Sequence, residues 1–184
     1  MGILYSSQVN GFLGFTFTPT PASVSSTSGS TGFATFSSEY PLDFSGTTTK
    51  AYTASLTEEN TVLLTPVTAV PANTGLLLKG ATEDIPVKAG FFDYSATNLL
   101  KASTADDIAA STDALHHYVL ANGSNGIGFY NLAADKNIGT KKAYLETTTA
   151  LATASEARVA WVFADDETTG INAIRGEKAN TNEF

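Results

Sequence analysis

Short apolar runs separated by turn-forming residues dominate the pattern of this chain. In residues 61–80, the apolar runs Val62–Leu64 and Leu76–Leu78 are separated by two prolines, an Asn and a Gly. Such punctuation is typical of β-strands joined by turns and fits a long helix poorly. Because the same pattern recurs over most of the chain, we expect an all-β protein, with an antiparallel β-sandwich as the simplest arrangement.

The strands are expected within residues 31–172, which we take as the β-sandwich domain. Lys50–Leu56 shows the alternation of a strand, and Asn122–Gly126 is rich in the residues of a tight hairpin loop. Pro41 marks a strand start or a sheet edge, and Pro86 interrupts a short edge strand, because proline cannot donate a ladder hydrogen bond. The other expected strands are 33–36, 40–44, 61–65, 75–79, 83–88, 116–120, 127–130, 142–146 and 157–163.

One short helix is also expected. Ser103–Ser111 begins with a serine that can cap a helix, and Asp106 and Asp107 follow in the first turn, where the helix dipole favours anions. Such a helix would be about two turns long. The predicted fold class is therefore an all-β antiparallel sandwich with an N-terminal extended arm and at most this one short helix.

Residues 1–30 are expected to form an apolar arm followed by a Ser/Thr/Pro linker. In an extended chain Phe15 and Phe17 share one face, and together with Phe12 they would not stay exposed without cause. Two interpretations remain open: the arm is a first strand of the main domain, or it docks on a neighbouring subunit. The linker has little to bury, and residues 173–184 are expected to be a polar tail.

Charge and composition exclude several kinds of partner. The net charge is −8, because 10 Lys and Arg are scattered among 18 Asp and Glu, whereas nucleic-acid binding needs clustered cations. No apolar run reaches the ~18 residues that a membrane-spanning helix needs. The chain has no Cys, which excludes disulfides and thiolate chemistry. We therefore expect neither nucleic-acid binding nor membrane insertion.

No pattern of catalytic or metal-binding residues stands out. His116 and His117 are adjacent, so in a strand they point to opposite faces and cannot readily bind one metal together. The acidic pair Asp106–Asp107 and the cluster Asp165–Glu167 fit solvated turns better than a calcium loop, which needs spaced ligands. No Gly-x-Ser-x-Gly motif is present. We therefore expect no enzyme activity, no cofactor and no metal.

Four tyrosines are the remaining candidates for ligand binding. Their rings could stack on the faces of sugars if they lined one surface. The alternative is that they are amphipathic residues at the edges of the core, with a buried ring and a hydrated hydroxyl. These residues are Tyr94, Tyr118, Tyr130 and Tyr144.

A further set of motifs runs through the β region in a fixed order: Gly32–Phe44 with Ala51–Tyr52, Val70–Gly80, Tyr118–Gly126, Gly128–Tyr130, Lys142–Leu145 and Thr168–Ile171. Together they resemble a β-rich module of secreted and cell-surface proteins of Bacteroidetes. In that family the module usually lies near the C-terminus, after repeats or adhesin-like domains. The resemblance covers about residues 31–172, and it implies a surface-exposed setting without assigning any catalytic residue.

Two functions follow as expectations. The first is a non-catalytic, surface-exposed module that serves adhesion, binds a protein or glycan on a cell surface, or spaces other domains, in an extracellular or cell-surface location. The alternative is a decoration, fibre or filament protein of a virion, which self-assembles through the N-terminal arm. The start of the chain lacks the positively charged segment of a secretory signal peptide, as expected for a virion protein made in the cytosol.

Overall fold

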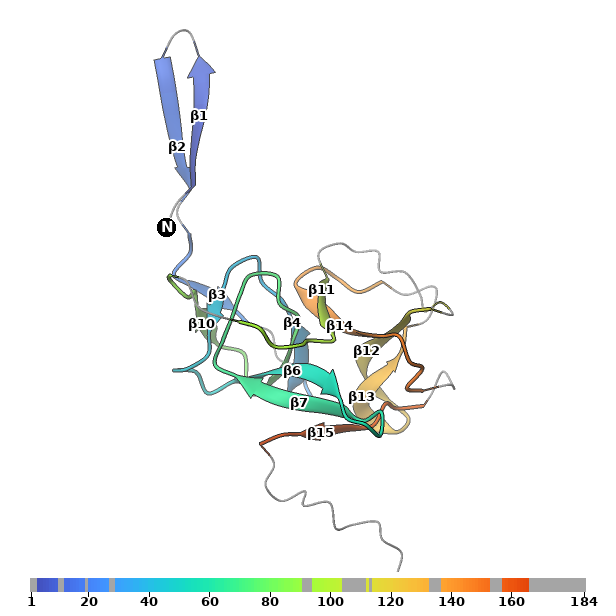
Figure 1. Cartoon of the computed structure of the whole chain (residues 1–184). Coiled ribbons are helices and arrows are strands. Elements are labelled where there is room, and N and C mark those ends of the chain that lie inside the picture. Colours follow the sequence, from blue (N-terminus) through green and yellow to red (C-terminus); the bar gives the residue numbers. More distant parts are fainter. Residues whose placement is uncertain are drawn as a thin grey trace, which may run out of the picture.

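All regular secondary structure in the described part of the chain is β. The computed structural model describes the backbone of residues 3–9 and 12–18, and all atoms of 20–26, 29–90, 94–103, 112, 114–132, 137–152 and 157–165. These residues contain fifteen strands, mostly in antiparallel pairs (Figure 1). The all-β prediction is confirmed. Residues 104–111 of the expected helix lie outside the described residues, and Ser103, its expected cap, instead ends a strand.

A five-stranded sheet forms the centre of the protein. All its neighbouring strands are antiparallel except for the pairing of its last strand, Trp161–Phe163, with Val62–Val67, which is parallel. The strands in spatial order are β15 (Trp161–Phe163), β7 (Val62–Val67), β6 (Lys50–Leu56), β9 (Leu76–Lys79) and β4 (Phe33–Phe36).

A four-stranded antiparallel sheet packs against one face of the five-stranded sheet. Its strands in spatial order are β11 (Leu100–Ser103), β14 (Lys142–Thr147), β12 (His116–Gly123) and β13 (Gly126–Asn131). Apolar side chains from both sheets meet between them, as expected for a β-sandwich. We call this cluster the inner core; its buried members are Tyr52, Ala54, Val62, Leu64, Leu77, Leu100, Tyr118, Phe129, Ala143, Leu145, Ala152 and Val159.

Two small sheets cover the other face of the five-stranded sheet. One pairs β5 (Leu42–Asp43) with β8 (Ala69–Val70), and the other pairs β3 (Ser23–Ser25) with β10 (Asp84–Pro86). They enclose a second apolar cluster, the outer core, so the body has three layers. The outer core contains Phe36, Leu42, Phe44, Ala51, Val70, Leu76, Leu78 and Ile85.

Part of the expected linker belongs to the body. β3 pairs with β10, and the pairing is extended at both ends by main-chain hydrogen bonds from Ser26 to the carbonyl of Glu83 and from Val87 to the carbonyl of Ala22, both 2.9 Å. The Ser26 hydroxyl also donates to the Glu83 carbonyl at 2.9 Å. Main-chain bonds need no apolar side chain, so a Ser-rich segment can be ordered by pairing alone. The boundary between arm and body therefore lies before residue 22 rather than at residue 30.

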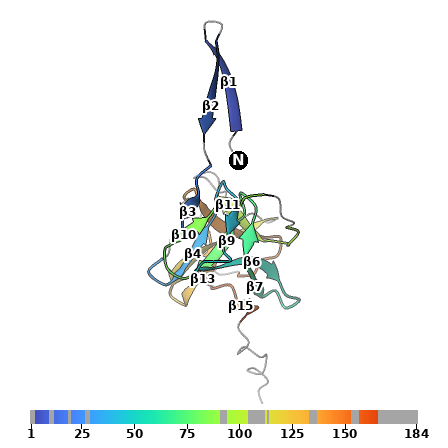
Figure 2. The ribbon, with the colours of Figure 1, turned by 90° about the vertical axis from the view of Figure 1, so that its left-hand side faces the viewer.

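The N-terminal arm is a hairpin rather than a single extended strand. β1 (Ile3–Val9) and β2 (Phe12–Thr18) pair antiparallel over their whole length, from Ile3 opposite Thr18 to Val9 opposite Phe12. Neither strand pairs with any other strand of the described chain, and the hairpin stands clear of the body in two perpendicular views (Figures 1 and 2). Phe12, Phe15 and Phe17 all belong to β2.

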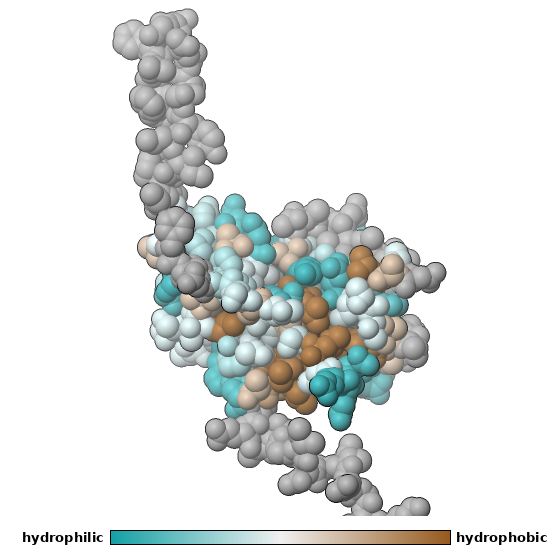
Figure 3. All heavy atoms as spheres, viewed as in Figure 1, coloured by the Kyte–Doolittle hydropathy of each residue, from teal (hydrophilic) through white to brown (hydrophobic). Residues whose placement is uncertain are grey.

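The small sheets leave one side of the outer face uncovered. There Val162, Leu63 and Ser55 lie side by side in the register of β15, β7 and β6. Val162 is 37% exposed, which makes it one of two large exposed hydrophobic residues in the described chain. Figure 3 shows apolar surface crossing β7 and β15 on this side.

Candidate functional site

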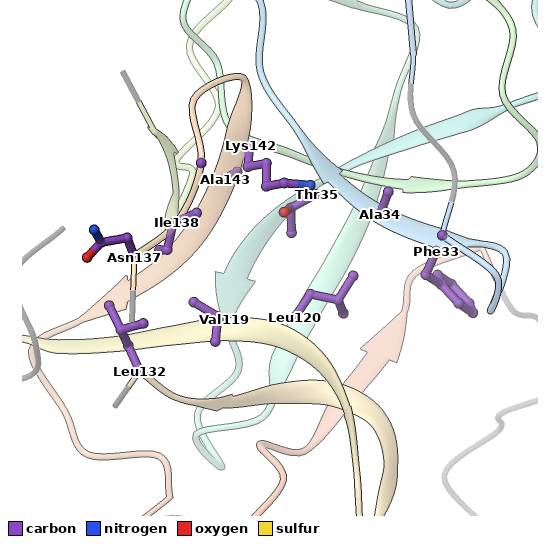
Figure 4. A pocket seen from close by; sticks show the side chains of 12 residues that line it. Phe33, Ala34, Thr35, Val119, Leu120, Leu132, Asn137, Ile138, Lys142 and Ala143 are labelled. Atoms are coloured by element: carbon purple, nitrogen blue, oxygen red, sulfur yellow. The ribbon is translucent and has the colours of Figure 1, made fainter. Parts of the chain in front are cut away.

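A pocket opens where the strands of the four-stranded sheet diverge. β12 and β14 pair only from His116 opposite Thr147 to Tyr118 opposite Leu145. Beyond Tyr118, β12 continues as the partner of β13, whereas the beginning of β14 turns toward β4. The gap between β12, β14 and β4 is a pocket of about 400 Å³ (Figure 4). We call it the inter-sheet pocket, and its volume lies within the range of small-ligand sites.

Hydrogen bonds from Ser37 hold β4 and β14 together at one end of the pocket. The Ser37 amide donates to the Lys141 carbonyl at 3.0 Å, and the Ser37 hydroxyl donates to the Lys142 carbonyl at 2.8 Å. Lys141 has a φ of 62°, a left-handed conformation that is uncommon outside Gly, Asn and Asp. Its amide donates to the Ser103 carbonyl at 3.2 Å. Bonds to two different strands therefore hold Lys141 in this conformation and fix where β14 begins.

The walls of the pocket are apolar and its mouth carries a few polar groups. Val119 and Leu120 rise from β12 on one side, opposite Thr35 on β4 (Figure 4). Few convergent polar groups on an apolar surface are typical of pockets that bind small molecules or single side chains. The polar lining side chains are Thr35, Asn137 and Lys142, and the other lining residues are Gly29, Phe33, Ala34, Val119, Leu120, Leu132, Ile138, Gly139 and Ala143.

On the edge of β4 that faces the pocket, the backbone N–H and C=O groups of one residue have no hydrogen-bond partner in the described chain. In the β4–β9 ladder the bonding directions alternate along the strand. Phe33 and Ser37 bond away from β9, because the Phe33 carbonyl accepts from Gly29 (3.3 Å) and the Ser37 amide donates to Lys141. Thr35 lies between them and has the same orientation. Its N–H and C=O have no partner in the described chain, although Thr35 is only 8% exposed.

Lys142 is the only charged side chain among the lining residues that the structure describes. Within the described ranges it forms no ion pair, whereas Lys50 and Lys88 are paired with Asp165 (2.8 Å) and Asp43 (2.9 Å). The chain as a whole has a net charge of −8. An ammonium group without an ion-pair partner can attract an anionic or carboxylate-bearing group.

An aromatic cluster closes the inner core beside the pocket. The ring of Phe33, which lines the pocket, lies 5.7 Å from Trp161 and 6.1 Å from Phe163, measured between ring centroids. The Lys79 ammonium lies 4.6 Å from the Phe163 centroid, in cation–π contact. These rings contact one another and a lysine, so we assign them to sealing the core rather than to stacking on a sugar.

Asp165 of the predicted acidic cluster is part of a small polar network. Its Oδ2 atom accepts from Lys50 Nζ at 2.8 Å and from the Tyr52 hydroxyl at 3.2 Å. The hydrogen bond from Lys50 lowers the pKa of this carboxyl. The arrangement explains an acidic residue at the end of β15 without a metal. Asp166 and Glu167, and likewise Asp106–Asp107, lie outside the described residues.

Two of the candidate tyrosines are buried in the protein interior. Tyr118 is fully buried in the inner core, and its hydroxyl accepts a hydrogen bond from the Leu151 amide at 2.7 Å. Tyr130 is 7% exposed, and its hydroxyl donates to the Gly126 carbonyl at 2.6 Å. Its ring lies over Gly123, where a Cβ would come within 2.7 Å of the ring. The prediction of sugar stacking is wrong for Tyr118 and Tyr130, because neither offers a ring face to solvent.

The other two tyrosines lie on different layers. Tyr144, on the outward face of the four-stranded sheet, is half-buried and packs edge-on against His117 with ring centroids 5.2 Å apart. Tyr94 packs against the outer core, and its buried hydroxyl has no hydrogen-bond partner in the described chain. Burial raises the pKa of both phenols. The four tyrosines therefore do not line one surface, and the alternative of tyrosines at core edges describes their positions better.

The histidines do not converge on a metal site. His117 is buried and its Nε2 atom lies 3.1 Å from Glu146 Oε2, whereas His116 is half-buried at the preceding position of β12. Within the described ranges no three His, Cys, Asp or Glu side chains are grouped so that they could hold a metal ion.

Nothing local in the sequence indicates the inter-sheet pocket. Its described lining residues come from Gly29 and β4, from β12, and from positions 132, 137–139, 142 and 143, which are distant in the chain. The one available signal is Lys141–Lys142, the only adjacent pair of cations in the sequence. A charge pair of this kind is most often a solvated surface feature, so only the tertiary structure links Lys142 to a pocket.

Comparison with protein-family models, curated proteins and solved structures finds no match to this chain. The resemblance to a module of Bacteroidetes surface proteins therefore stays a prediction. In the described part of the chain, no helix has the length and apolar character needed to cross a membrane.

Proposed function

We propose that this chain is a non-catalytic β-sandwich module that binds a ligand in the inter-sheet pocket, in a cell-surface or extracellular setting. The observation that carries the proposal is the pocket of about 400 Å³ between the two sheets. It combines apolar walls from β12 with a hydroxyl, an amide and an ammonium at its mouth. This composition suits recognition of a small apolar group that also carries polar atoms.

The chemistry of the lining residues favours binding over catalysis. General acid–base and nucleophilic mechanisms need a titratable group near neutrality or a nucleophile held beside a base. Among the described lining residues, the polar side chains are those of Thr35, Asn137 and Lys142, which include no carboxylate or imidazole that could act as a base. The module would therefore present its ligand site as a rigid surface between two packed sheets.

The test is a ligand screen read out at single residues. We expect hits from a library of glycans, peptides and small molecules to shift the backbone amide resonances of Val119, Asn137 and Lys142 in the isotope-labelled full chain. Val119→Trp should fill the pocket and abolish these shifts. Leu63→Trp, on the far face of the five-stranded sheet, is the matched control and should leave them intact. Hits that bind both variants equally, or that shift only residues elsewhere, would contradict the proposal.

A second candidate function is assembly into a virion or filament through the N-terminal hairpin. β1 and β2 pair only with each other in the described chain, and residues 3–18 contain no charged residue. A two-stranded hairpin is at best marginally stable alone in water, and both of its edges can pair with another chain. Self-association or docking through β1 or β2 would stabilise it.

Removal of the hairpin tests the assembly candidate without disturbing the body. A variant that lacks residues 1–19 keeps Ala22–Ser26, which pair along β10. We expect light scattering to give a larger mass for the full chain than for this variant, with the difference growing with concentration. If both proteins are monomers at every concentration, self-assembly through the hairpin is excluded.

A further inference from the structure

The unpaired backbone of Thr35 has the geometry to receive one residue of an extended chain. Its N–H and C=O both point away from β9, as in the hydrogen-bonded pairs of an antiparallel ladder, where two residues exchange two bonds. On either side the edge of β4 is already occupied, by Gly29 at Phe33 and by Lys141 at Ser37. A ligand chain can therefore pair at Thr35 alone and cannot continue along the strand.

Lys142 places a positive charge next to this backbone pair. In Figure 4 its side chain runs from β14 toward Thr35, across the mouth of the pocket. Its ammonium has no carboxylate partner within the described ranges. A ligand group that accepts a hydrogen bond from the Thr35 N–H can thus also meet a cation, and a carboxylate is the group that gains from both.

The apolar walls lie where a side chain of the same ligand residue would extend. Val119 and Leu120 face the mouth from β12, and Ile138 lies at the far wall (Figure 4). Among the described residues that line this space, Lys142 alone carries a charge. The pocket volume of about 400 Å³ is ample for a leucine- or phenylalanine-sized group.

From these three features we propose that the ligand is an apolar amino acid with an acylated nitrogen and a free carboxylate. This inference rests on the pocket being the binding site. The ligand N–H donates to the Thr35 carbonyl, and its carboxylate accepts from the Thr35 N–H and from Lys142 Nζ. Its side chain packs against Val119 and Leu120. Both the C-terminal residue of a protein chain and a free N-acyl amino acid have this chemistry.

A titration with matched peptides tests the inference on the intact protein. The probes are acetyl-Gly-Leu with a free carboxylate, the same peptide as a C-terminal amide, and the acid with an N-methylated leucine. We expect the acid to shift the amides of Thr35, Val119 and Lys142. The amide and the N-methyl acid should each bind about tenfold more weakly, the effect expected for losing one hydrogen bond to a charged or buried partner.

Two adjacent lysines supply the protein control. Lys142→Gln should weaken binding of the acid to the level of the amide, without lowering the unfolding temperature, because Lys142 is exposed. Lys141→Asn removes the neighbouring charge, and Asn readily adopts the left-handed φ of this position. This control should bind the acid nearly as well as the parent protein.

The outcomes separate this inference from the proposed function. Equal binding of acid and amide at the pocket, or equal binding by Lys142→Gln and Lys141→Asn, would contradict recognition of the ligand carboxylate. The pocket would still be a binding site. If glycans shift the amide resonances of the pocket residues and no peptide acid does, the ligand is not an N-acylated amino acid. If affinity rises from acetyl-Leu to longer peptide acids, the ligand is a protein C-terminus. Equal affinity assigns it to a free N-acyl amino acid.

Discussion

The two large sheets bury their strands in different ways. In β9 of the five-stranded sheet, the successive residues Leu76, Leu77 and Leu78 are all buried. In β14 of the four-stranded sheet, the side chains alternate: Leu145 is fully buried, whereas Tyr144 is half-buried. Neighbouring side chains in a strand point to opposite faces, so an unbroken apolar run means that both faces are covered and alternation means that one face is.

The small sheets account for this difference. β5, β8, β3 and β10 form the layer that encloses the outer core, against which Leu76 and Leu78 pack, while Leu77 points into the inner core. The four-stranded sheet packs its Leu145 side into the inner core and has Tyr144 and Glu146 on its outward side. In β9 the three successive leucines are therefore all buried because both faces of this strand are covered.

The largest effect on stability is expected at Leu78, which is buried in the outer core. Leu78→Ala should lower the free energy of unfolding by about 2–5 kcal/mol, because it opens a cavity in the outer core. Tyr144→Ala, on the outward face of the four-stranded sheet, should cost about half as much or less, because its ring is already partly hydrated. Urea unfolding measures both values. Equal costs would mean that the small sheets do not pack on the five-stranded sheet as described.

Two glycines, Gly75 and Gly128, lie where other segments approach the backbone closely. A Cβ at Gly75 would lie 2.6 Å from the Leu100 carbonyl oxygen, so the backbone of β11 would have to move. Gly75→Ala should therefore cost about 1–3 kcal/mol. At Gly128 a Cβ would meet only the flexible side chain of Arg158, which can rotate away.

Gly128→Ala is the matched control for Gly75→Ala, and we expect it to cost less than about 1 kcal/mol. Both variants are compared by thermal and urea unfolding. If Gly128→Ala were the more destabilising change, the close approach of the sheets at Leu100 would be less important than the packing of Arg158 on β13.

The smallest effect is expected from the ion pair between Lys88 and Asp43, which lies in the layer formed by the small sheets. Asp43 in β5 accepts from the Ser45 amide (3.0 Å) and from Lys88 Nζ (2.9 Å). The hydrogen bonding of Ser45, with a further contribution from Lys88, lowers the pKa of Asp43 from the 3.8 of an unperturbed carboxyl to about 2. Because the folded-state pKa is the lower one, this stabilisation is present above about pH 4 and is lost as the pH falls toward 2.

Thermal unfolding at about pH 5 and about pH 2.5 tests this linkage. Asp43→Asn should be less stable than the parent protein at the higher pH, by less than about 1 kcal/mol because the pair is partly solvated. The difference should shrink at the lower pH. Glu58→Gln, in the exposed turn after β6, is the control and should show no such convergence. A difference that persists at low pH would show that Asp43 acts other than through its charge.

Local pattern predicted the strands that are bounded by strong turn signals. Lys50–Leu56 is a strand over its full predicted length, since its alternating residues end at the polar turn 57–60. Asn122–Gly126 is indeed the connection of the β12–β13 hairpin, with its turn at residues 124 and 125. In both cases the information lies within a few residues of the element, where backbone preferences act.

Elements that depend on a distant partner could not be predicted in this way. Ser103 is predicted to cap a helix, yet it ends the strand Leu100–Ser103, because this segment pairs with β14 from Leu100 opposite Leu145 to Ser103 opposite Lys142. Ser23–Ser25 is predicted to be part of a linker, yet its main chain forms the hydrogen bonds of a strand pair with β10. The candidate site is the extreme case, because Thr35, Val119 and Lys142 come from three separate segments.

The construction from short strands follows from the amino-acid sequence alone, because proline, glycine and asparagine at close intervals prevent long helices. The sequence also determined an acidic, cysteine-free chain with an uncharged stretch at residues 3–18. Tertiary contacts bury both faces of β9 in the central sheet, place Tyr118 in the interior and open a pocket beside Thr35. Strand partners and register are set by contacts between residues far apart in the chain, and those contacts leave no local trace.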